Sequence, residues 1–277
     1  MTKIIDGKKV SKEIKENLKK IIELFPTKPK LAVIQVGDDS ASEIYVNMKR
    51  KETEKIGIDF MFIKYDSDIN EEIIEETIKS LNKDKSINGI LIQLPLPSNI
   101  DSKRILNLID PSKDVDGLTD YNIAKLINKE DAIIPCTPFG IIKLLEYYNI
   151  DVRDKNIVVV GRSNLVGRPL SNILLNMDAT VTVCHSKTKD LKEYTKRADI
   201  LFVATGKKHL ITRDMIKRGA VLIDVGINRE NDKLYGDINF DNVYKKCSMI
   251  TPVPGGVGPM TIAMLLYNLV SCYKKQK

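Results

Sequence analysis

The apolar run Ile157-Val158-Val159-Val160 is the feature that most narrows what this chain can fold into. A run of β-branched residues with no polar face is typical of a parallel strand that is buried on both sides. Helical and apolar segments alternate after it, with helices predicted at 166–177, 189–197 and 212–218 and strands at 180–184, 200–204 and 221–225. This alternation predicts a doubly wound α/β domain with a Rossmann-type parallel sheet.

The beginning of the chain shows the same alternation on a smaller scale. A helical pattern at 10–25 is followed by predicted strands at 31–36, 58–64 and 87–94 and predicted helices at 40–56 and 71–81. Ser40 and Glu43 have the spacing of a capping box at the start of the second helix. The order of these elements predicts an N-terminal βαβαβ domain.

The length of 277 residues is near the size at which one core divides into two, so we expect two domains. Residues 1–117 are predicted to form the N-terminal domain and residues 118–277 the Rossmann-type domain. A last helix, at 259–277, follows a loop rich in glycine and proline. We expect this helix to pack back on the N-terminal domain.

Composition argues against several classes of protein. Hydrophobic residues make up 43% of the chain and charged residues 29%, without an apolar run of membrane-spanning length, so neither disorder nor a membrane partner is expected. The amino terminus has no apolar signal core, which makes the cytoplasm the expected location. The net charge of +7 could favour nucleic acid, but basic and acidic residues alternate along helical stretches such as 12–16. We therefore expect no nucleic-acid partner.

Residue types that bind metals are few and scattered. The cysteines have neither the spacing of a zinc site nor that of a disulfide framework, and they stand at Cys136, Cys184, Cys247 and Cys272. Only His185 and His209 could join them. The sequence predicts no metal site.

The segment Gly161 to Pro169 lies between the buried strand and a predicted helix, where backbone amides and the helix dipole favour an anion. Ser163 and Val166 stand where the dinucleotide fingerprint G-x-G-x-x-G has glycines. A phosphate-binding loop and a tight turn without a ligand are therefore both open interpretations of this segment alone.

The end of the next predicted strand favours NADP over NAD. An NAD site usually has an acidic residue there for the ribose 2′-hydroxyl, but this chain continues Cys184-His185-Ser186-Lys187-Thr188. Arg162, Ser186 and Lys187 are suited to a 2′-phosphate through charge-assisted hydrogen bonds. The predicted cofactor-binding residues are Gly161, Arg162, Ser163, Ser186, Thr205 and Ile227.

Tyr45 and Lys49 are four residues apart in a predicted helix, so they share one face. By themselves they are compatible with an exposed tyrosine beside a solvated lysine. Several other unusual segments are expected to gather at the carboxyl ends of strands, where α/β proteins bind ligands. These segments are Gln93-Leu94-Pro95-Leu96-Pro97, Asp114-Val115-Asp116-Gly117, Pro135-Cys136-Thr137-Pro138 and the stretch from Pro252 to Pro259.

Together these segments resemble the signatures of the bifunctional methylenetetrahydrofolate dehydrogenase/methenyltetrahydrofolate cyclohydrolase family. The resemblance includes 36–42, Tyr45-x-x-x-Lys49, the Gln93 loop, 113–117, the Gly161 loop and 252–261, in the family's order and over nearly the whole chain. It implies NADP-dependent oxidation of 5,10-methylenetetrahydrofolate and hydrolysis of the methenyl product to 10-formyltetrahydrofolate. It also implies a homodimer.

The resemblance implies roles for individual residues. Lys49 would be the main catalytic group, Gln93 would orient it, and Tyr45 would pack on the aminobenzoate ring of the substrate. Asp116 would hold the pterin. The resemblance further places Pro254, Gly255 and Gly256 on the substrate side, and it makes 1–117 the catalytic and folate-binding domain and 118–277 the NADP-binding domain.

The residue types suit this chemistry. Hydride would leave a carbon flanked by two nitrogens and give a delocalised cation, so the oxidation needs no histidine or tyrosine base. Hydrolysis adds water to that cation, and a lysine of lowered pKa can serve as both base and acid. A carboxylate at Asp116 can accept two adjacent donors of a pterin. Asp114 is the less suitable member of the pair and is expected to be structural.

Alternatives remain open on the sequence. The acidic motif also suits a surface turn, and the glycines after Pro254 also suit an interdomain crossover. Residues 118–124 depart from the family pattern, which commonly has an aromatic residue and a histidine after Gly117 and a glycine at Ala124. A dehydrogenase without strong cyclohydrolase activity, a shikimate-type or malic-type dehydrogenase, and a basic RNA-binding or scaffold protein are the competing hypotheses.

Overall fold

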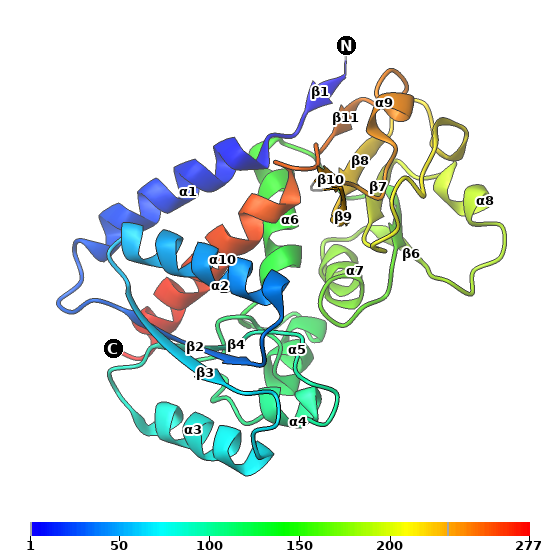
Figure 1. The fold of residues 1–277 in the computed structure, drawn as a ribbon. Coiled ribbons are helices and arrows are strands. Elements are labelled where there is room, and N and C mark those ends of the chain that lie inside the picture. Colours follow the sequence, from blue (N-terminus) through cyan, green and yellow to red (C-terminus); the bar gives the residue numbers. More distant parts are fainter. Residues whose placement is uncertain (1, 232) are drawn as a thin grey trace. The chain divides into compact units, whose positions relative to one another are not determined.

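The predicted buried strand lies inside a six-stranded parallel sheet (Figure 1). The computed structural model of the protein describes residues 2–231 and 233–277, leaving aside the side chains of Ser40 and Ala41. The strand order is β1-β11-β8-β7-β5-β6. The strands are β1 (Lys3–Ile4), β5 (Asn156–Val160), β6 (Thr180–Cys184), β7 (Ile200–Val203), β8 (Val221–Asp224) and β11 (Met249–Ile250).

The chain reverses direction across this sheet at β5. Strand β6 pairs with one edge of β5, and β7 pairs with the other, so the carboxyl ends of β5, β6 and β7 lie at the same edge of the sheet. Helix α7 (Gly167–Asn176) connects β5 to β6 and packs on both strands. This is the doubly wound arrangement that the sequence predicts, and such a switch point is where these folds bind ligands.

Apolar side chains of the central strands fill the core of this sheet. Val158, Val160, Leu201, Val203 and Leu222 are all buried in one cluster. Each such side chain contributes roughly 1.5–3 kcal/mol when it leaves water. The β-branched run therefore fixes β5 at the centre of the sheet.

A second, three-stranded parallel sheet has the predicted βαβαβ connectivity. Strand β2 (Lys30–Val36) lies between β3 (Asp59–Tyr65) and β4 (Gly89–Ile92). The crossovers are α2 (Ser40–Lys55) and α3 (Glu71–Lys83). Helix α3 buries Ile74, Ile78 and Leu81, which have the spacing of one helical face. The predicted fold class, an α/β protein with these two parts, is confirmed.

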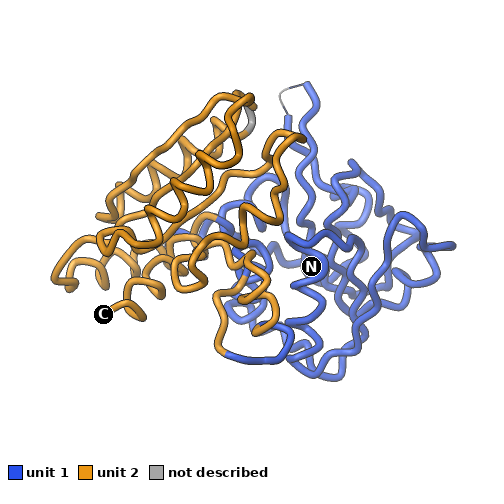
Figure 2. Tube along the Cα trace, turned by 90° about the horizontal axis from the view of Figure 1, so that it is seen from below, with its two compact units in different colours: residues 1–12, 126–130, 135–261 blue, residues 13–125, 131–134, 262–277 orange. Residues whose placement is uncertain are grey.

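The chain divides into two compact units (Figure 2). Unit 1 consists of residues 1–12, 126–130 and 135–261, and unit 2 of residues 13–125, 131–134 and 262–277. Helices α1 (Gly7–Ile22) and α10 (Val257–Lys275) each begin in unit 1 and end in unit 2. The division after Gly117 stays a prediction about where separable domains meet.

Several local predictions need correction. A helix over 212–218 is wrong, because only the 3-10 turn η1 (Arg213–Met215) forms, and Ile216 then adopts an extended conformation that buries its side chain in the core. The cap of α2 is Asp39 rather than Ser40, since the Asp39 carboxylate accepts the N–H of Ser42 at 2.8 Å. The Ser40 side chain lies outside the described residues. Glu43 instead pairs with Lys64 at 2.8 Å.

The sequence patterns do not predict the short elements. These are β1, β11, α4 (Ser102–Leu106), α5 (Asp120–Ile127), α9 (Phe240–Val243) and the hairpin of β9 (Asn228–Glu230) and β10 (Lys233–Tyr235). Strand β1 pairs in parallel with β11, which brings the amino terminus to the edge of the six-stranded sheet. Two-residue strands carry no periodicity, so only the folded chain reveals such pairing.

Across residues 2–231 and 233–277, the helices are too short or too polar to cross a membrane.

Candidate functional site

Lys49 and Gln93 meet in unit 2 although they lie on different elements. The Nζ of Lys49, on α2, donates to the Oε1 of Gln93 at 2.8 Å. Gln93 follows β4, and its backbone N–H continues the ladder by donating to Ile34 at 2.8 Å. Its Nε2 donates to the carbonyl of Leu94 at 2.8 Å, which directs Oε1 toward the lysine. A nearly buried amide on a rigid strand end thus holds the side-chain nitrogen of Lys49 in place.

Tyr45 lies one helical turn before Lys49 and is 42% exposed. Ile44 and Met48 on the same helix are also exposed. By spacing, Met48 lies one turn after Tyr45 on the same side of the helix, so exposed apolar surface continues beside the tyrosine. Exposed apolar surface of this kind suits a flat, partly aromatic ligand. Met48 is a candidate that the sequence motifs do not single out.

Arg50, the residue after Lys49, packs on two aromatic rings of the neighbouring strand. Its guanidinium carbon lies 5.4 Å from the ring centroids of both Phe60 and Phe62, on β3. These cation–π contacts join α2 to the neighbouring strand. Lys49 and Arg50 are adjacent in sequence, but Lys49 bonds Gln93 whereas Arg50 packs on β3.

The two aspartates of the acidic loop, Asp114-Val115-Asp116-Gly117, have different surroundings. Asp114 is buried and accepts from the N–H groups of Gly117 and Thr119, each at 2.9 Å, and from the Thr119 hydroxyl at 2.7 Å. Asp116 is half-buried two residues later. The carboxylate of Asp114 is thus occupied in closing the turn, and Asp116 is the member of the pair suited to a ligand.

The segment that departs from the family pattern completes this turn. Asn122, on α5, donates through Nδ2 to Asp114 at 2.9 Å and to the carbonyl of Pro111 at 3.1 Å. Thr119 and Asn122 are both buried. The segment thus supports the acidic loop from inside. A Thr and an Asn at turn and helix-start positions are the only sequence signal of this role.

Lys113 attaches the acidic loop to the end of α3. Its buried Nζ donates to the carbonyls of Leu81, Asn82 and Asp84 at 2.8, 2.8 and 2.7 Å. Burial lowers the pKa of Lys113, although the nearby carboxylates of Asp110 and Asp84 act in the opposite direction. These bonds satisfy carbonyls that have no partner at the end of a helix. The loop that carries Asp116 is therefore fixed from two sides.

In unit 1, the loop after β5 is built around Gly161. This residue has φ +123°, and a Cβ there would lie 2.2 Å from the carbonyl oxygen of Ala204, so only glycine fits. The Ser163 hydroxyl accepts the N–H of Val166 at 3.2 Å. Helix α7 then begins at Gly167. The turn delivers the positive end of a ten-residue helix to the carboxyl edge of the sheet.

The residues predicted for a 2′-phosphate gather at the same edge. Val160 and Cys184 are paired residues at the ends of β5 and β6. Arg162, Ser186 and Lys187 follow them and are all exposed. No carboxylate stands between Cys184 and Lys187. This donor set fits the phosphorylated dinucleotide rather than its unphosphorylated form.

Thr205 and Ile227 follow β7 and β8. The Thr205 hydroxyl donates to the Asp237 carboxylate at 2.8 Å, so its oxygen is oriented from inside the protein. Ile227 is 44% exposed, which leaves an apolar side chain at the sheet edge. The six predicted cofactor residues thus lie on loops that follow four strands of one sheet.

The segment Pro254-Gly255-Gly256 belongs to unit 1, at the start of α10. The carbonyl of Gly255 accepts the N–H of Lys8 at 3.0 Å, and Gly256 donates to Pro252 at 2.8 Å. The first contact joins Gly255 to the first turn of α1 and the second closes the turn before α10, so the glycines have a packing role. Their substrate-side role stays a prediction. Tyr45, Lys49, Gln93 and Asp116 all belong to unit 2.

Two buried aspartates in unit 1 form a site that the sequence motifs do not predict. Asp224 ends β8, and Asp237 follows the hairpin. Burial, together with the nearby charge of Asp237, raises the pKa of Asp224 to about 7 against the effect of three backbone N–H donors. The only signal in the sequence is a pair of short Asp- and Gly-containing segments, 224–226 and 236–237.

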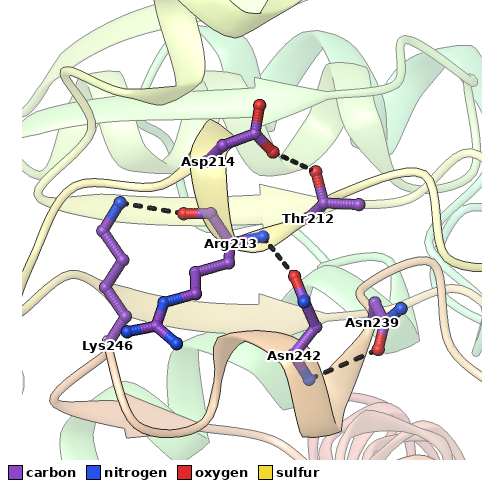
Figure 3. A pocket seen from close by; sticks show the side chains of 6 residues that line it. All are labelled: Thr212, Arg213, Asp214, Asn239, Asn242 and Lys246. Atoms are coloured by element: carbon purple, nitrogen blue, oxygen red, sulfur yellow. Dashed lines mark hydrogen bonds between the residues drawn. The ribbon is translucent and has the colours of Figure 1, made fainter.

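A cavity of about 590 Å³ lies beside η1 and α9, and Figure 3 shows the side chains that line it. Its polar groups bond one another: Lys246 donates to the Arg213 carbonyl at 2.8 Å, and Thr212 donates to Asp214 at 2.6 Å. Asn242 accepts the N–H of Arg213. The cavity is lined by a structural network, and its lining residues include none of the predicted site residues.

Among the residues that the structure describes, there is no cluster of His, Cys, Asp and Glu side chains with the arrangement of a metal site.

Comparison with known proteins identifies both parts of the chain. Residues 5–116 match the model of the tetrahydrofolate dehydrogenase/cyclohydrolase catalytic domain, and residues 135–277 match the NAD(P)-binding domain of the same family. A bifunctional protein FolD from Nitratiruptor is 52% identical, with 99% of each chain covered.

Solved structures agree over the full length. The bifunctional FolD enzyme of Campylobacter jejuni, a methylenetetrahydrofolate dehydrogenase/cyclohydrolase, has a TM-score of 0.98 and 46% identity, covering all of both chains. The Trypanosoma brucei FolD, solved with NADP cofactor and inhibitor, has a TM-score of 0.95 and 35% identity, covering 99% of this chain and 98% of that one.

The raised pKa of Asp224 predicts a pH-dependent stability. Its pKa is about 7 in the folded protein against an ordinary value of 3.8, so the folded state binds more protons between these values. The contribution is fully present below about pH 3.8 and is lost as the pH rises through 7. Asp224→Asn should remove this dependence. Between pH 5 and pH 8 the wild type should lose on the order of 2 kcal/mol of unfolding free energy relative to the variant.

Urea unfolding at the two pH values measures this difference. Asp214→Asn is the matched control, because pairing with Lys192 lowers the pKa of Asp214 to about 2, outside the range tested. Equal pH slopes for wild type and Asp224→Asn would contradict the expectation.

Proposed function

Since the chain belongs to the tetrahydrofolate dehydrogenase/cyclohydrolase family, we propose that Lys49 and Gln93 form its catalytic pair. The protein is an enzyme that oxidises 5,10-methylenetetrahydrofolate to 5,10-methenyltetrahydrofolate with NADP and hydrolyses the product to 10-formyltetrahydrofolate. Family membership removes the shikimate-type, malic-type and RNA-binding alternatives. What remains to be assigned is the part that each residue plays.

The observation that carries the assignment is the 2.8 Å hydrogen bond from Lys49 Nζ to Gln93 Oε1. It fixes a flexible amine on the helix face that also carries the exposed ring of Tyr45, one turn earlier. A lysine held in one rotamer loses less entropy when it binds or reacts. The hydrogen bond thus joins two of the predicted catalytic residues directly.

In the hydrolytic step, water adds to the carbon that lies between the two nitrogens of the methenyl cation. The amine of Lys49 accepts a proton from that water as the new C–O bond forms. The resulting ammonium returns that proton to one nitrogen as its bond to the carbon breaks. The Lys49 amine then takes the remaining hydroxyl proton as the C=O bond of the formyl group forms, and this proton passes to solvent. Gln93 accepts a hydrogen bond from the lysine throughout and keeps Nζ directed toward the reacting carbon.

In the oxidative step, bound NADP supplies the hydride acceptor. The chain's own residues position the substrate, because loss of hydride from a carbon between two nitrogens requires no protein base. Tyr45 stacks on the aminobenzoate ring, and the carboxylate of Asp116 accepts from the two adjacent donors of the pterin. Pro254, Gly255 and Gly256 complete the substrate side.

Arg162 and Ser186 hold the 2′-phosphate of NADP, and Gly161 and Ser163 form the loop for its diphosphate. Support comes from the shared sheet edge, the N-terminus of α7 and the lack of a carboxylate after Cys184. Thr205 and Ile227 line the remaining part of the cofactor site. The relative solved with NADP is consistent with this choice of cofactor.

We further propose that residues 1–117 are the catalytic and folate-binding domain, that residues 118–277 bind NADP, and that the helix at 259–277 returns to the first domain. The limits of the two family models, 5–116 and 135–277, support this division. We also propose a homodimer that works in the cytoplasm. Size measurement in solution tests the dimer.

Lys49→Ala should reduce the hydrolysis of methenyltetrahydrofolate by about 10²- to 10⁴-fold, which is the usual contribution of a positioned acid–base group. The melting temperature and the Kd for NADP should stay unchanged. Loss of methenyl absorbance above the spontaneous rate measures hydrolysis. Lys51→Ala, on an exposed residue of the same helix, is the matched control and should behave as the wild type. Undiminished hydrolysis in Lys49→Ala would remove Lys49 from the proposed role.

Asp116→Ala should raise the KM for methylenetetrahydrofolate by about 10- to 100-fold, because hydrogen bonds to a charged group contribute roughly 1.5–3 kcal/mol. The KM for NADP should change little. Steady-state kinetics with each substrate varied in turn separates the two effects. Asp120→Ala, at an exposed carboxylate nearby, is the control. An equal rise in both KM values would indicate that Asp116 supports the loop and does not hold the pterin.

A further inference from the structure

We propose that Asp237 is a positioning residue for NADP: its buried carboxylate holds the loop after β7 and the segment after β8 in the conformation that receives the cofactor. The inference rests on the proposed function, because it takes Thr205 and Ile227 as cofactor-site residues. Asp237 itself is fully buried, so it acts through these segments and does not touch the ligand.

The first contact set fixes the loop after β7. Three consecutive backbone N–H groups, those of Thr205, Gly206 and Lys207, donate to Asp237 at 2.6, 3.0 and 2.8 Å. The Thr205 hydroxyl donates to the same carboxylate at 2.8 Å. A loop whose successive amides all converge on one side chain has little freedom to change shape. Its position directly after β7 is the carboxyl edge where doubly wound sheets bind dinucleotides.

The second contact set fixes the segment after β8. Asn228 donates through Nδ2 to Oδ1 of Asp237 at 2.9 Å, the same oxygen that accepts the N–H of Lys207. Asn228 directly follows Ile227, the exposed apolar residue of the predicted cofactor site. One carboxylate therefore joins two segments that each carry a predicted cofactor residue.

Asp224 holds Asp237 in place from the end of β8. Its carboxylate accepts the N–H of Asp237 at 3.0 Å and that of Ile238 at 2.8 Å. Each carboxylate faces a glycine of the other segment. A Cβ on Gly236 would lie 1.9 Å from an Asp224 oxygen, and a Cβ on Gly226 would lie 2.1 Å from an Asp237 oxygen. The two segments therefore fit together only as this reciprocal pair.

The positions of the N–H donors bound by Asp237 show that the aspartate pair does more than join neighbouring strands of the sheet. Neighbouring strands β7 and β8 already pair through their own backbones. The groups bound by Asp237 lie beyond β7 and β8, in residues 205–207 and in Asn228 at the start of β9, which the β7–β8 ladder does not reach. Burying a carboxylate costs free energy, and here its hydrogen bonds fix the conformation of the segments that follow β7 and β8.

Asp237→Asn is the direct test. An amide of the same size brings an N–H₂ group against donors, so the loop should loosen. We expect the Kd for NADP, measured by titration calorimetry, and the KM for NADP to rise at least tenfold. Hydrolysis of methenyltetrahydrofolate assayed without cofactor, and the KM for methylenetetrahydrofolate, should stay within twofold of the wild type. A general structural defect would instead slow the cofactor-free hydrolysis and raise the KM for methylenetetrahydrofolate as well.

Asp199→Asn is the matched control. Asp199 also accepts a backbone N–H, that of Asn156 at 2.9 Å, but it precedes β7 at the amino ends of the strands. Its replacement should lower the unfolding free energy and leave the Kd for NADP unchanged. Asn228→Ala is a milder second variant that removes one donor to Asp237. It should raise the Kd several-fold and decides the matter if Asp237→Asn does not fold.

Arg162→Ala separates failure of this inference from failure of the proposed cofactor site. If Arg162→Ala weakens NADP binding while neither Asp237→Asn nor Asn228→Ala does, the positioning role is overturned and the cofactor site stands. If none of the three weakens binding, the cofactor does not lie at this sheet edge. If folded Asp237→Asn loses cofactor-free hydrolysis and NADP binding in parallel, the role of Asp237 is structural, and the inference is also overturned.

Discussion

Parallel pairing of β5 with β6 on one side and β7 on the other is the constraint on which the cofactor-binding part of the structure depends. Parallel strands require crossovers, and their carboxyl ends therefore share one edge. The loops at that edge cannot pair with a ladder, so their amides need other partners. The buried Asp237 carboxylate accepts three of these amides. Together with the Gly161 turn and the N-terminus of α7, it shapes the edge that we propose binds a phosphorylated dinucleotide.

Aspartates in this chain divide between building loops and facing ligands. Asp114 and Asp237 are buried acceptors that each gather neighbouring amides and a hydroxyl into a fixed turn. Asp116, two residues after Asp114, is half-buried and is the carboxylate proposed to meet the pterin. In both units a buried acid thus fixes a loop whose residues are proposed to face a ligand. The proposed substrate and cofactor sites are held by the same physical device.

Features with a local pattern are predictable from the sequence, and features made by distant partners are not. Strand β6 forms at the predicted residues, because alternation of helix and strand is visible in the chain. The helix expected over 212–218 fails since Ile216 gains more by burial in extended form. Lys49 and Gln93 are motif residues, but their hydrogen bond joins positions 44 apart. The Asp224–Asp237 pair has no motif spacing, so its role emerges only from the folded contacts.

The central claim is that one chain oxidises methylenetetrahydrofolate with NADP and uses the lysine site of unit 2 for hydrolysis, a step that consumes no cofactor. The most direct measurement is a two-stage assay of the purified protein. Methylenetetrahydrofolate is supplied with NADP or NAD while NADPH or NADH and the methenyl species are followed, and methenyltetrahydrofolate is then supplied alone. We predict NADP-preferring formation and methenyl loss above the spontaneous rate. Formation without accelerated loss would contradict the hydrolytic role of Lys49, and no formation with either cofactor would contradict the whole assignment.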